Sequence, residues 1–112
     1  MNLTTETIGN VVVVTLPGET LDAGNTKPLK DELTAVLQPG AKLVFDLSQL
    51  RFVDSSGLGL LLSSLRQVHN TGGDLKLCGM NKAVRALFEL VRMHRVFEIF
   101  ATRDEARASY GS

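Results

Sequence analysis

The chain has 112 residues, and its 12 basic and 12 acidic side chains give a formal net charge of zero. This length suits one small domain that buries about two thirds of its unfolded surface, so folding requires neither a disulfide nor a metal. The neutral balance and the few, scattered aromatic residues argue against a general nucleic-acid-binding surface.

The N-terminal third of the chain predicts a β-hairpin followed by a helix. Residues 3–8 alternate loosely, and Gly9-Asn10 supplies a tight turn into the β-branched run 11–16, which is typical of a strand covered on both faces. In residues 26–37, apolar side chains recur at helical spacing, which predicts an amphipathic helix. Pro39-Gly40 is expected to end this helix.

The rest of the chain alternates between strands and helices. Strands are predicted at residues 42–47, 74–78 and 96–100, and helical periodicity predicts a central helix from about residue 55 to residue 70. Asn81 and Thr102 are expected to cap two later helices, because their side-chain oxygens can accept bonds from free backbone N–H groups. Such alternation implies parallel strands joined by right-handed crossovers. The whole chain, residues 1–112, is therefore expected to form one α/β domain, with a mixed β-sheet, an N-terminal hairpin and packed helices.

The most informative stretch is Asp54-Ser55-Ser56-Gly57-Leu58-Gly59, which lies where a loop enters the predicted central helix. One interpretation is a well-capped helix, since Asp and Ser accept hydrogen bonds from the first free backbone N–H groups. The other is a phosphate site, because a helix N-terminus carries about half a positive charge and several unpaired donors. Such a phosphate could belong to a ligand or be bonded to a serine.

A bound nucleotide is not favoured at this stretch. It lacks the Gly-Lys-Ser/Thr ending of a P-loop and the glycine spacing of a dinucleotide fingerprint. Modification of a serine is the better candidate. Nucleophilic catalysis is not supported, because no histidine or cysteine falls near Ser55 in the sequence. No metal-ligand spacing or nucleophile–base set is present, so we expect no catalytic residue, metal or cofactor.

The hexapeptide resembles the signature of the bacterial STAS domains, the family of anti-sigma factor antagonists. The likeness continues in order along nearly the whole chain. Leu21-Asp22-Ala23 resembles the segment after the second strand of the family, residues 72–77 resemble its Gly-Gly turn and next strand, and residues 84–90 resemble its late helix. One departure is visible: Gly18-Glu19-Thr20-Leu21-Asp22 carries one residue more than the usual Gly-Glu-Leu/Ile-Asp.

This resemblance implies a non-catalytic partner switch. The unphosphorylated form is expected to bind an anti-sigma factor that is also a serine kinase, which frees a sigma factor for transcription. The kinase is expected to phosphorylate Ser55, and a PP2C-type serine phosphatase is expected to reset the module. The partner-binding residues implied by the resemblance are Asp22, Asp54, Ser56, Gly57, Leu58 and Gly59. No direct contact with nucleic acid or with a membrane is expected.

Two other classes of function stay open from the sequence. One is a small-ligand or nucleotide-binding STAS module of a transporter-associated or other signalling complex, which would bind a nucleotide tightly and saturably. The other is a hydrolytic enzyme, whose turnover would be lost on Ser55→Ala. The sequence does not say which sigma factor or kinase is involved, or whether the output is transcription.

The single cysteine, the two histidines, a short cationic segment and the lack of a membrane span support four smaller predictions. Cys78 is expected to be a small buried core residue, and no internal disulfide can form with a single cysteine. His69 is expected on the polar surface of the central helix, far from His94. Residues 91–95 are cationic and form either a solvated face or a contact for an acidic partner. No signal peptide or apolar membrane span occurs, which predicts a cytoplasmic protein.

Overall fold

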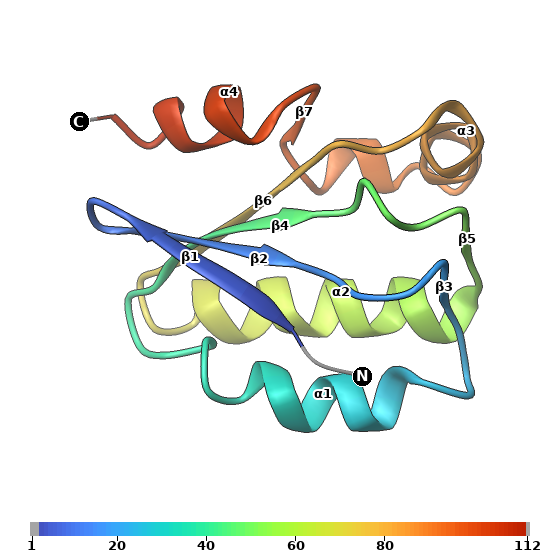
Figure 1. Ribbon diagram of the computed structural model, residues 1–112, viewed down its shortest axis with the longest axis horizontal. Helices are drawn as coiled ribbons and strands as arrows, with labels where there is room; N and C mark the ends of the chain where they lie inside the picture. Colours follow the sequence, from blue (N-terminus) through green and yellow to red (C-terminus); the bar gives the residue numbers. More distant parts are fainter. Residues whose placement is uncertain (1–2, 112) are drawn as a thin grey trace.

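A mixed five-stranded β-sheet forms the centre of the molecule (Figure 1). The structure is a computed structural model that describes residues 3–111. Its strands lie in the order β1-β2-β4-β6-β7. They comprise β1 (Thr4–Ile8), β2 (Val11–Thr15), β4 (Lys42–Asp46), β6 (Asp74–Cys78) and β7 (Ile99–Phe100). The first pair is antiparallel, and every later pair is parallel. The predicted hairpin and parallel crossovers are therefore confirmed.

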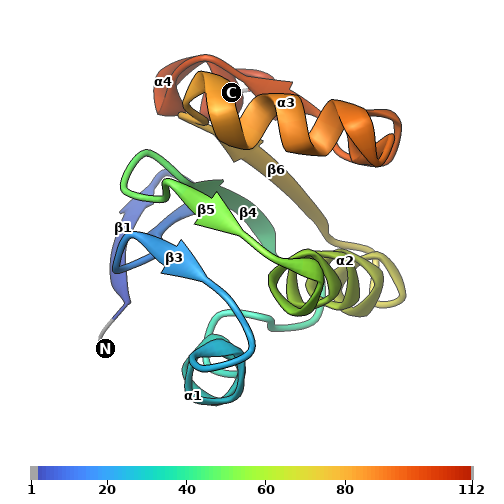
Figure 2. The same ribbon diagram turned by 90° about the vertical axis from the view of Figure 1, so that its right-hand side faces the viewer.

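A separate two-stranded sheet lies at one end of the main sheet. Its members are β3 (Thr20–Leu21) and β5 (Phe52–Val53), which pair in parallel with Leu21 opposite Val53. The sequence analysis did not predict this pair, because two-residue strands are too short to show alternation. The end-on view in Figure 2 shows β3 and β5 side by side, with the central helix beginning where β5 ends. This small sheet joins the loop before the first helix to the loop before the central helix.

Helices cover both faces of the main sheet. Helices α1 (Thr26–Leu33) and α2 (Ser55–His69) lie together on one face, and α4 (Arg103–Ala108) lies on the other (Figure 1). Helix α3 (Lys82–Leu90) packs near β5, and a short 3-10 helix, η1 (Met93–Arg95), follows it. The larger core cluster lies under α1, α2 and α3, and a smaller one, which includes Val13, Val44 and Ala106, lies under α4.

Two predicted elements are shorter than expected. The first helix ends at Leu33 rather than at residue 37. Its last turn tightens, since the Val36 amide bonds to the Leu33 carbonyl at 2.9 Å, three residues back, as helix ends commonly do. The strand expected at 96–100 is reduced to Ile99–Phe100. Phe97 instead turns inward and packs edge-on against Phe88, with 6.3 Å between ring centroids.

Several local predictions are confirmed. Asn81 accepts a bond from the Val84 amide at 2.8 Å, and Thr102 accepts one from the Glu105 amide at 3.1 Å, so both side chains cap helices as expected. Cys78 is fully buried, and this burial, with the Asp46 charge adding to it, raises the pKa of its thiol to about 12. Within residues 3–111, no helix combines the length and the apolar character that crossing a bilayer requires.

The C-terminal helix is tied to the sheet by ionic contacts. Arg103, at the start of α4, donates to the Asp46 carboxylate at 2.6 and 3.1 Å and to Glu6 on β1 at 3.1 Å. Burial alone raises the pKa of Asp46, but hydrogen bonds from Arg103 and Ser48 outweigh it and leave the pKa below its ordinary value. Asp46 thus belongs to a structural contact between β4 and α4.

Candidate functional site

Asp54 begins the central helix and holds two loops together. One carboxylate oxygen accepts from the Gly57 amide at 2.9 Å, which caps α2, and the other accepts from the Ala23 amide at 3.1 Å. The Asp54 amide in turn donates to the Leu21 carbonyl at 3.1 Å. The Gly57 hydrogen bond lowers the pKa of Asp54 most, and the Ala23 bond adds to this, so the carboxylate is ionised at neutral pH.

Asp22 organises the neighbouring loop. Its carboxylate accepts from the Gly24 amide at 2.8 Å and from the Thr20 hydroxyl at 3.1 Å. Its own amide donates to the Asn25 side chain at 2.9 Å. These bonds fold residues 20–25 into a compact turn that presents Ala23 to Asp54. Asp22 and Asp54 therefore lie in adjoining loops.

Gly57 is buried because the loop of residues 20–25 passes directly over it. A Cβ at this position would collide with the Leu21 carbonyl oxygen and lie 2.8 Å from a methyl group of Val53. No side chain fits there, so glycine is required for the close packing of β3 and β5 on α2. The structure places Gly57 inside the fold, where it allows the loops to pack closely on α2.

Ser55 and Ser56 are both exposed in the first turn of α2. The described residues form no hydrogen bond with either hydroxyl group. Ser55 is the first helical residue, directly after the cap, and its hydroxyl is open to solvent. A helix N-terminus tolerates negative charge, because its unpaired N–H groups and its dipole favour anions. A phosphate on Ser55 would therefore fit the local backbone.

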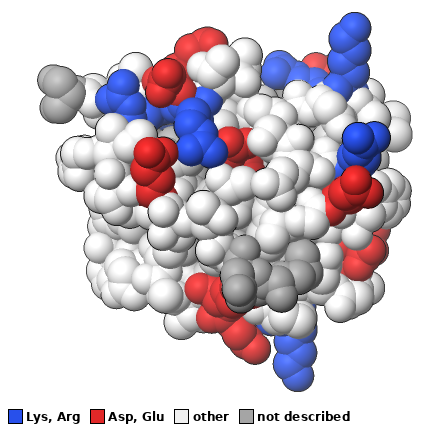
Figure 3. Space-filling view, in the orientation of Figure 1, with Lys and Arg blue, Asp and Glu red and all other residues white. Residues whose placement is uncertain are grey.

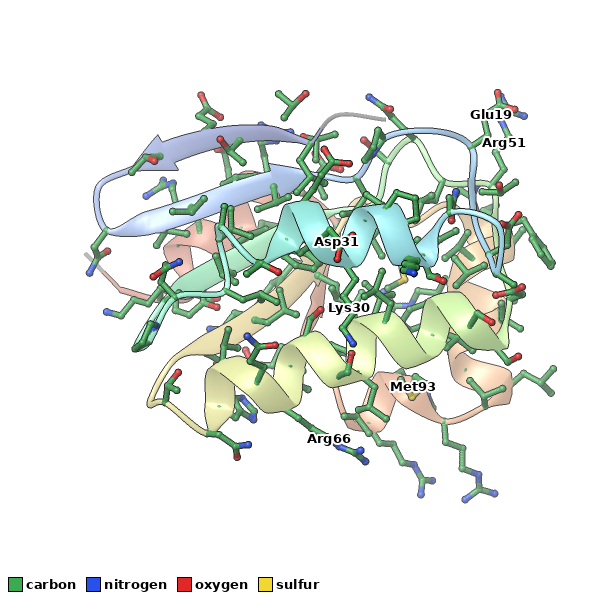
Figure 4. All side chains as sticks on the ribbon, turned by 90° about the horizontal axis from the view of Figure 1, so that it is seen from below. Glu19, Lys30, Asp31, Arg51, Arg66 and Met93 are labelled. Atoms are coloured by element: carbon green, nitrogen blue, oxygen red, sulfur yellow. The ribbon has the colours of Figure 1, made fainter. Side chains whose placement is uncertain are left out.

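A groove between α1 and α2 adjoins Ser56. It has a volume of about 570 Å³. Its lining comprises Thr26, Lys27, Lys30 and Asp31 of α1 and Ser56, Gly59, Leu60 and Ser63 of α2. Lys30 points from α1 toward α2 in Figure 4. A Cβ at Gly59 would meet nothing within 4 Å, so the groove is open at this residue. Leu58 is half-buried and packs against the core, with only part of its surface available.

Sequence reasoning missed several contributors to this surface. Lys27 and Lys30 were not predicted as site residues, because only the packing of α1 beside α2 brings them near Ser56. Phe52, two residues before Asp54, leaves 53% of its surface exposed. The alternation of Phe52 with buried Val53 could have signalled it, but the pattern spans only two residues. Glu19 pairs with Arg51 at 3.7 Å at the rim of the same end, where Figure 4 shows them together.

Three other titratable residues, His69, Cys78 and Asp46, lie outside the site at Ser55. His69, in the last turn of α2, is exposed as predicted and lies 2.8 Å from the Asp74 carboxylate. The helix separates it from Ser55 by 14 residues, or about 21 Å at the usual rise. Cys78 is buried, and Asp46 pairs with Arg103. In the described part of the chain, no three acidic, histidine or cysteine side chains gather as metal ligands would.

Charge is mixed over the visible surface. On the face in Figure 3, basic and acidic side chains lie close together at the upper left, at the right and at the bottom, so neither charge gathers into a patch of its own. A phosphate-backbone footprint requires a basic patch of one sign, and this face has none. The charges on this face therefore do not indicate a nucleic-acid-binding site.

Comparison with known proteins identifies the domain. The model of the STAS domain family matches residues 2–106. BtrV of Bordetella bronchiseptica is 30% identical over 111 residues, which cover 98% of this chain and 95% of BtrV. The anti-sigma-B factor antagonist of Bacillus subtilis is 27% identical over 95 residues, covering 85% and 86% of the two chains.

A solved structure has the same fold. The Bacillus cell fate determinant SpoIIAA in its phosphorylated form superposes with a TM-score of 0.69 at 23% identity, covering 96% of this chain and 98% of SpoIIAA. At that identity the likeness shows the fold alone. The family model and the near full-length relatives go further, and the expected resemblance is confirmed: this chain is a STAS domain and belongs to the family of anti-sigma factor antagonists.

Proposed function

We propose that this protein is an anti-sigma factor antagonist whose partner binding is controlled by phosphorylation of Ser55. In the unphosphorylated form, it binds an anti-sigma factor that is also a serine kinase and so releases a sigma factor. Phosphorylation of Ser55 ends this binding, and a PP2C-type phosphatase restores it. The chain, residues 1–112, works as one STAS domain without catalytic activity of its own, and it acts in the cytoplasm beside these partners.

The observation that carries this proposal is the placement of Ser55. It is exposed, it follows a cap residue that is fixed by two hydrogen bonds, and it lies beside a groove between two helices. An exposed hydroxyl on a rigid helix start can enter the active site of a kinase without unfolding of the domain. Its neighbour Ser56 lines the groove between α1 and α2, so a partner seated in this groove would lie close to Ser55.

The proposed docking surface combines the two loops and the groove. Asp22 and Asp54 shape the loops, and the exposed faces of Ser56, Leu58 and Gly59 contact the partner directly. Gly57 contributes by keeping the loops close to α2. Along one wall of the groove, Lys27 and Lys30 outnumber the single acidic residue, Asp31, which favours an acidic stretch of the partner.

Release follows from electrostatics at this surface. A phosphoserine carries about −1.5 to −2 charges at neutral pH, and on Ser55 it would stand next to the ionised Asp54. Burying that charge against a partner without a matching cation costs several kcal/mol, or orders of magnitude in affinity. Binding is therefore expected only before phosphorylation.

Incubation with the anti-sigma factor kinase of the same organism and labelled ATP tests the assignment. Wild type and Ser56→Ala should both incorporate phosphate, the variant more slowly because it alters the groove next to the acceptor. Ser55→Ala should incorporate none. Ser56→Ala is the matched control, since the two serines are adjacent, equally exposed and in the same helical turn. Normal labelling of Ser55→Ala would move the modification to another residue.

A further inference from the structure

A second surface lies beyond the groove at Ser55. It is formed by the end of α3 and by η1, and we name it the α3–η1 surface. Its apolar members are Leu90, Val91 and Val96, and its basic members are Arg92, His94 and Arg95. It shares no residue with the groove between α1 and α2.

The apolar side chains of this surface are unusually exposed. Leu90 leaves 79% of its surface in solvent, and Val91 and Val96 leave 45% and 49%. A single exposed leucine needs no explanation, but three large apolar side chains within seven consecutive residues form a patch. The earlier part of α3 packs against the core through its buried residues, Val84 and Phe88.

The basic side chains around the patch are left without partners. Among the described residues, Arg92 and Arg95 form no ion pair, whereas the neighbouring acids are already engaged. Glu89 pairs with Arg85 at 3.4 Å, and Glu98 pairs with Lys76 at 3.2 Å. The α3–η1 surface therefore keeps a net positive charge.

The backbone at Arg92 is strained. Its φ angle is +64°. Among the described residues, Arg92 is the only residue other than glycine with a positive φ. Glycine or asparagine usually occupies this position after a helix, because a Cβ is unfavourable there. An arginine in this conformation costs stability, which is common where a side chain is needed for contact with a partner.

A groove of about 610 Å³ runs along the same surface. Arg85 and Arg95 supply its basic side chains, Glu98 supplies an acidic one that is paired with Lys76, and His94 and the apolar residues of the segment 96–100 supply the rest of its lining. It lies beside β7, the edge strand of the main sheet. A carboxylate beside an apolar side chain inserted here could pair with the Arg95 guanidinium, because carboxylates are its natural partners.

We propose that the α3–η1 surface binds an acidic segment of a partner protein, one that places apolar side chains between its carboxylates. Carboxylates would pair with Arg92 and Arg95, and an apolar anchor would cover Leu90 and Val96. A second copy of this chain is disfavoured, because two such surfaces would bring like charges together. This surface is independent of phosphorylation at Ser55, so the domain can hold one partner here while the Ser55 surface is free or occupied.

The test uses a synthetic probe, a peptide in which leucines at helical spacing are surrounded by glutamates. Two control peptides replace glutamate by lysine or leucine by serine. Titration into isotope-labelled protein should give saturable shifts of backbone amides in residues 85–100 with the Glu–Leu peptide only. Ser55→Asp should bind the probe as wild type does, which separates this surface from the proposed switch.

Variants test which side chains act. Arg95→Glu should weaken probe binding about tenfold or more, whereas Lys82→Glu, the same charge reversal at the other end of α3, should change it little. Leu90→Ser should also weaken binding. Arg92→Gly should weaken binding while the melting temperature stays equal or rises, because it removes a charge and relieves the backbone together.

Three results would overturn this proposal. The first is binding of the Glu–Ser or Lys–Leu peptide as tightly as the Glu–Leu peptide. The second is a set of shifts confined to the groove between α1 and α2. The third is binding to vesicles of phosphatidylcholine with phosphatidylglycerol, lost in Arg95→Glu, without saturable binding of any peptide. That last result would assign the surface to an anionic membrane.

Discussion

The Asp54 carboxylate accepts a hydrogen bond from the Ala23 amide at 3.1 Å, across 31 residues of sequence. The same side chain caps α2 through the Gly57 amide. One residue thus sets both the start of the helix and the position of the loop beside it. This arrangement explains how an exposed serine at the helix start can have a fixed surrounding surface.

Asp54→Asn tests the link between the loops. The amide side chain can still cap α2 through its oxygen. Its NH₂ group would then face the Ala23 N–H, and this NH₂ group cannot accept a hydrogen bond. We expect the helix content to be unchanged and hydrogen exchange at Ala23 to become faster, measured by NMR. Equal protection of Ala23 in both proteins would show that the Asp54–Ala23 bond does not hold the loop.

The same bond predicts a pH effect. The pKa of Asp54 in the folded protein lies below its ordinary value of 3.8, chiefly because of the Gly57 hydrogen bond. The bonds to the carboxylate are therefore complete above pH 3.8 and are lost as the pH falls through the lowered pKa. In wild type, the protection of Ala23 should fall over that acid range. Asp54→Asn should show no matching transition.

The two glycines of the motif offer a matched pair. Gly57→Ala should destabilise the domain by about 1–3 kcal/mol, because its methyl group would collide with Leu21 and Val53. Gly59→Ala, two residues later in the same helix, meets open space and should stabilise the domain by up to about 1 kcal/mol through helix propensity. Urea unfolding followed by circular dichroism measures both. Equal effects of the two substitutions would contradict the packing described for Gly57.

Much of this architecture could be predicted from the sequence, for identifiable reasons. The β-branched run before Pro17 and the leucine spacing after Gly57 are long enough to reveal their periods, so the main strands and the central helix were located correctly. The caps at Asp54 and Asn81 act locally, so their residue types were sufficient.

The remainder depended on contacts between distant residues. The pairing of Leu21 with Val53 spans two very short strands, and the groove beside Ser56 exists only because α1 packs next to α2. Likewise, Phe97 was assigned to a strand because it lies in an apolar run, but its packing on Phe88 turns it out of the sheet. No local pattern encodes these contacts.

The contact between Arg103 and Asp46 predicts a stability effect far from the site. Arg103→Ala should cost about 1.5–3 kcal/mol, because the buried Asp46 carboxylate would lose its charged hydrogen-bond donor. Asp46 has a lowered pKa, so this contribution is present above pH 3.8 and disappears as the pH falls through the lowered value. The difference in urea midpoint between wild type and Arg103→Ala should shrink accordingly in acid. A difference that stays constant down to pH 2 would contradict this assignment.

Phosphorylation should leave the fold intact. A negative charge at a helix N-terminus is tolerated or favourable by about 0.3–1 kcal/mol, and the Ser55 side chain is exposed. The phosphorylated and unphosphorylated proteins should therefore have the same far-UV circular dichroism and nearly the same melting temperature. A fall of about ten degrees, equivalent to more than 1 kcal/mol in a domain of this size, would mean that the phosphate disrupts the fold.

Calorimetric titration of the anti-sigma factor with wild type, Ser55→Ala and Ser55→Asp tests the central claim most directly. Ser55→Ala should bind about as well as wild type and stay bound when ATP is added, because it keeps the surface and cannot be phosphorylated. Ser55→Asp should bind at least about tenfold more weakly, because its charge stands beside Asp54 and is buried on binding. Equal affinity of the alanine and aspartate variants would contradict the electrostatic switch at Ser55.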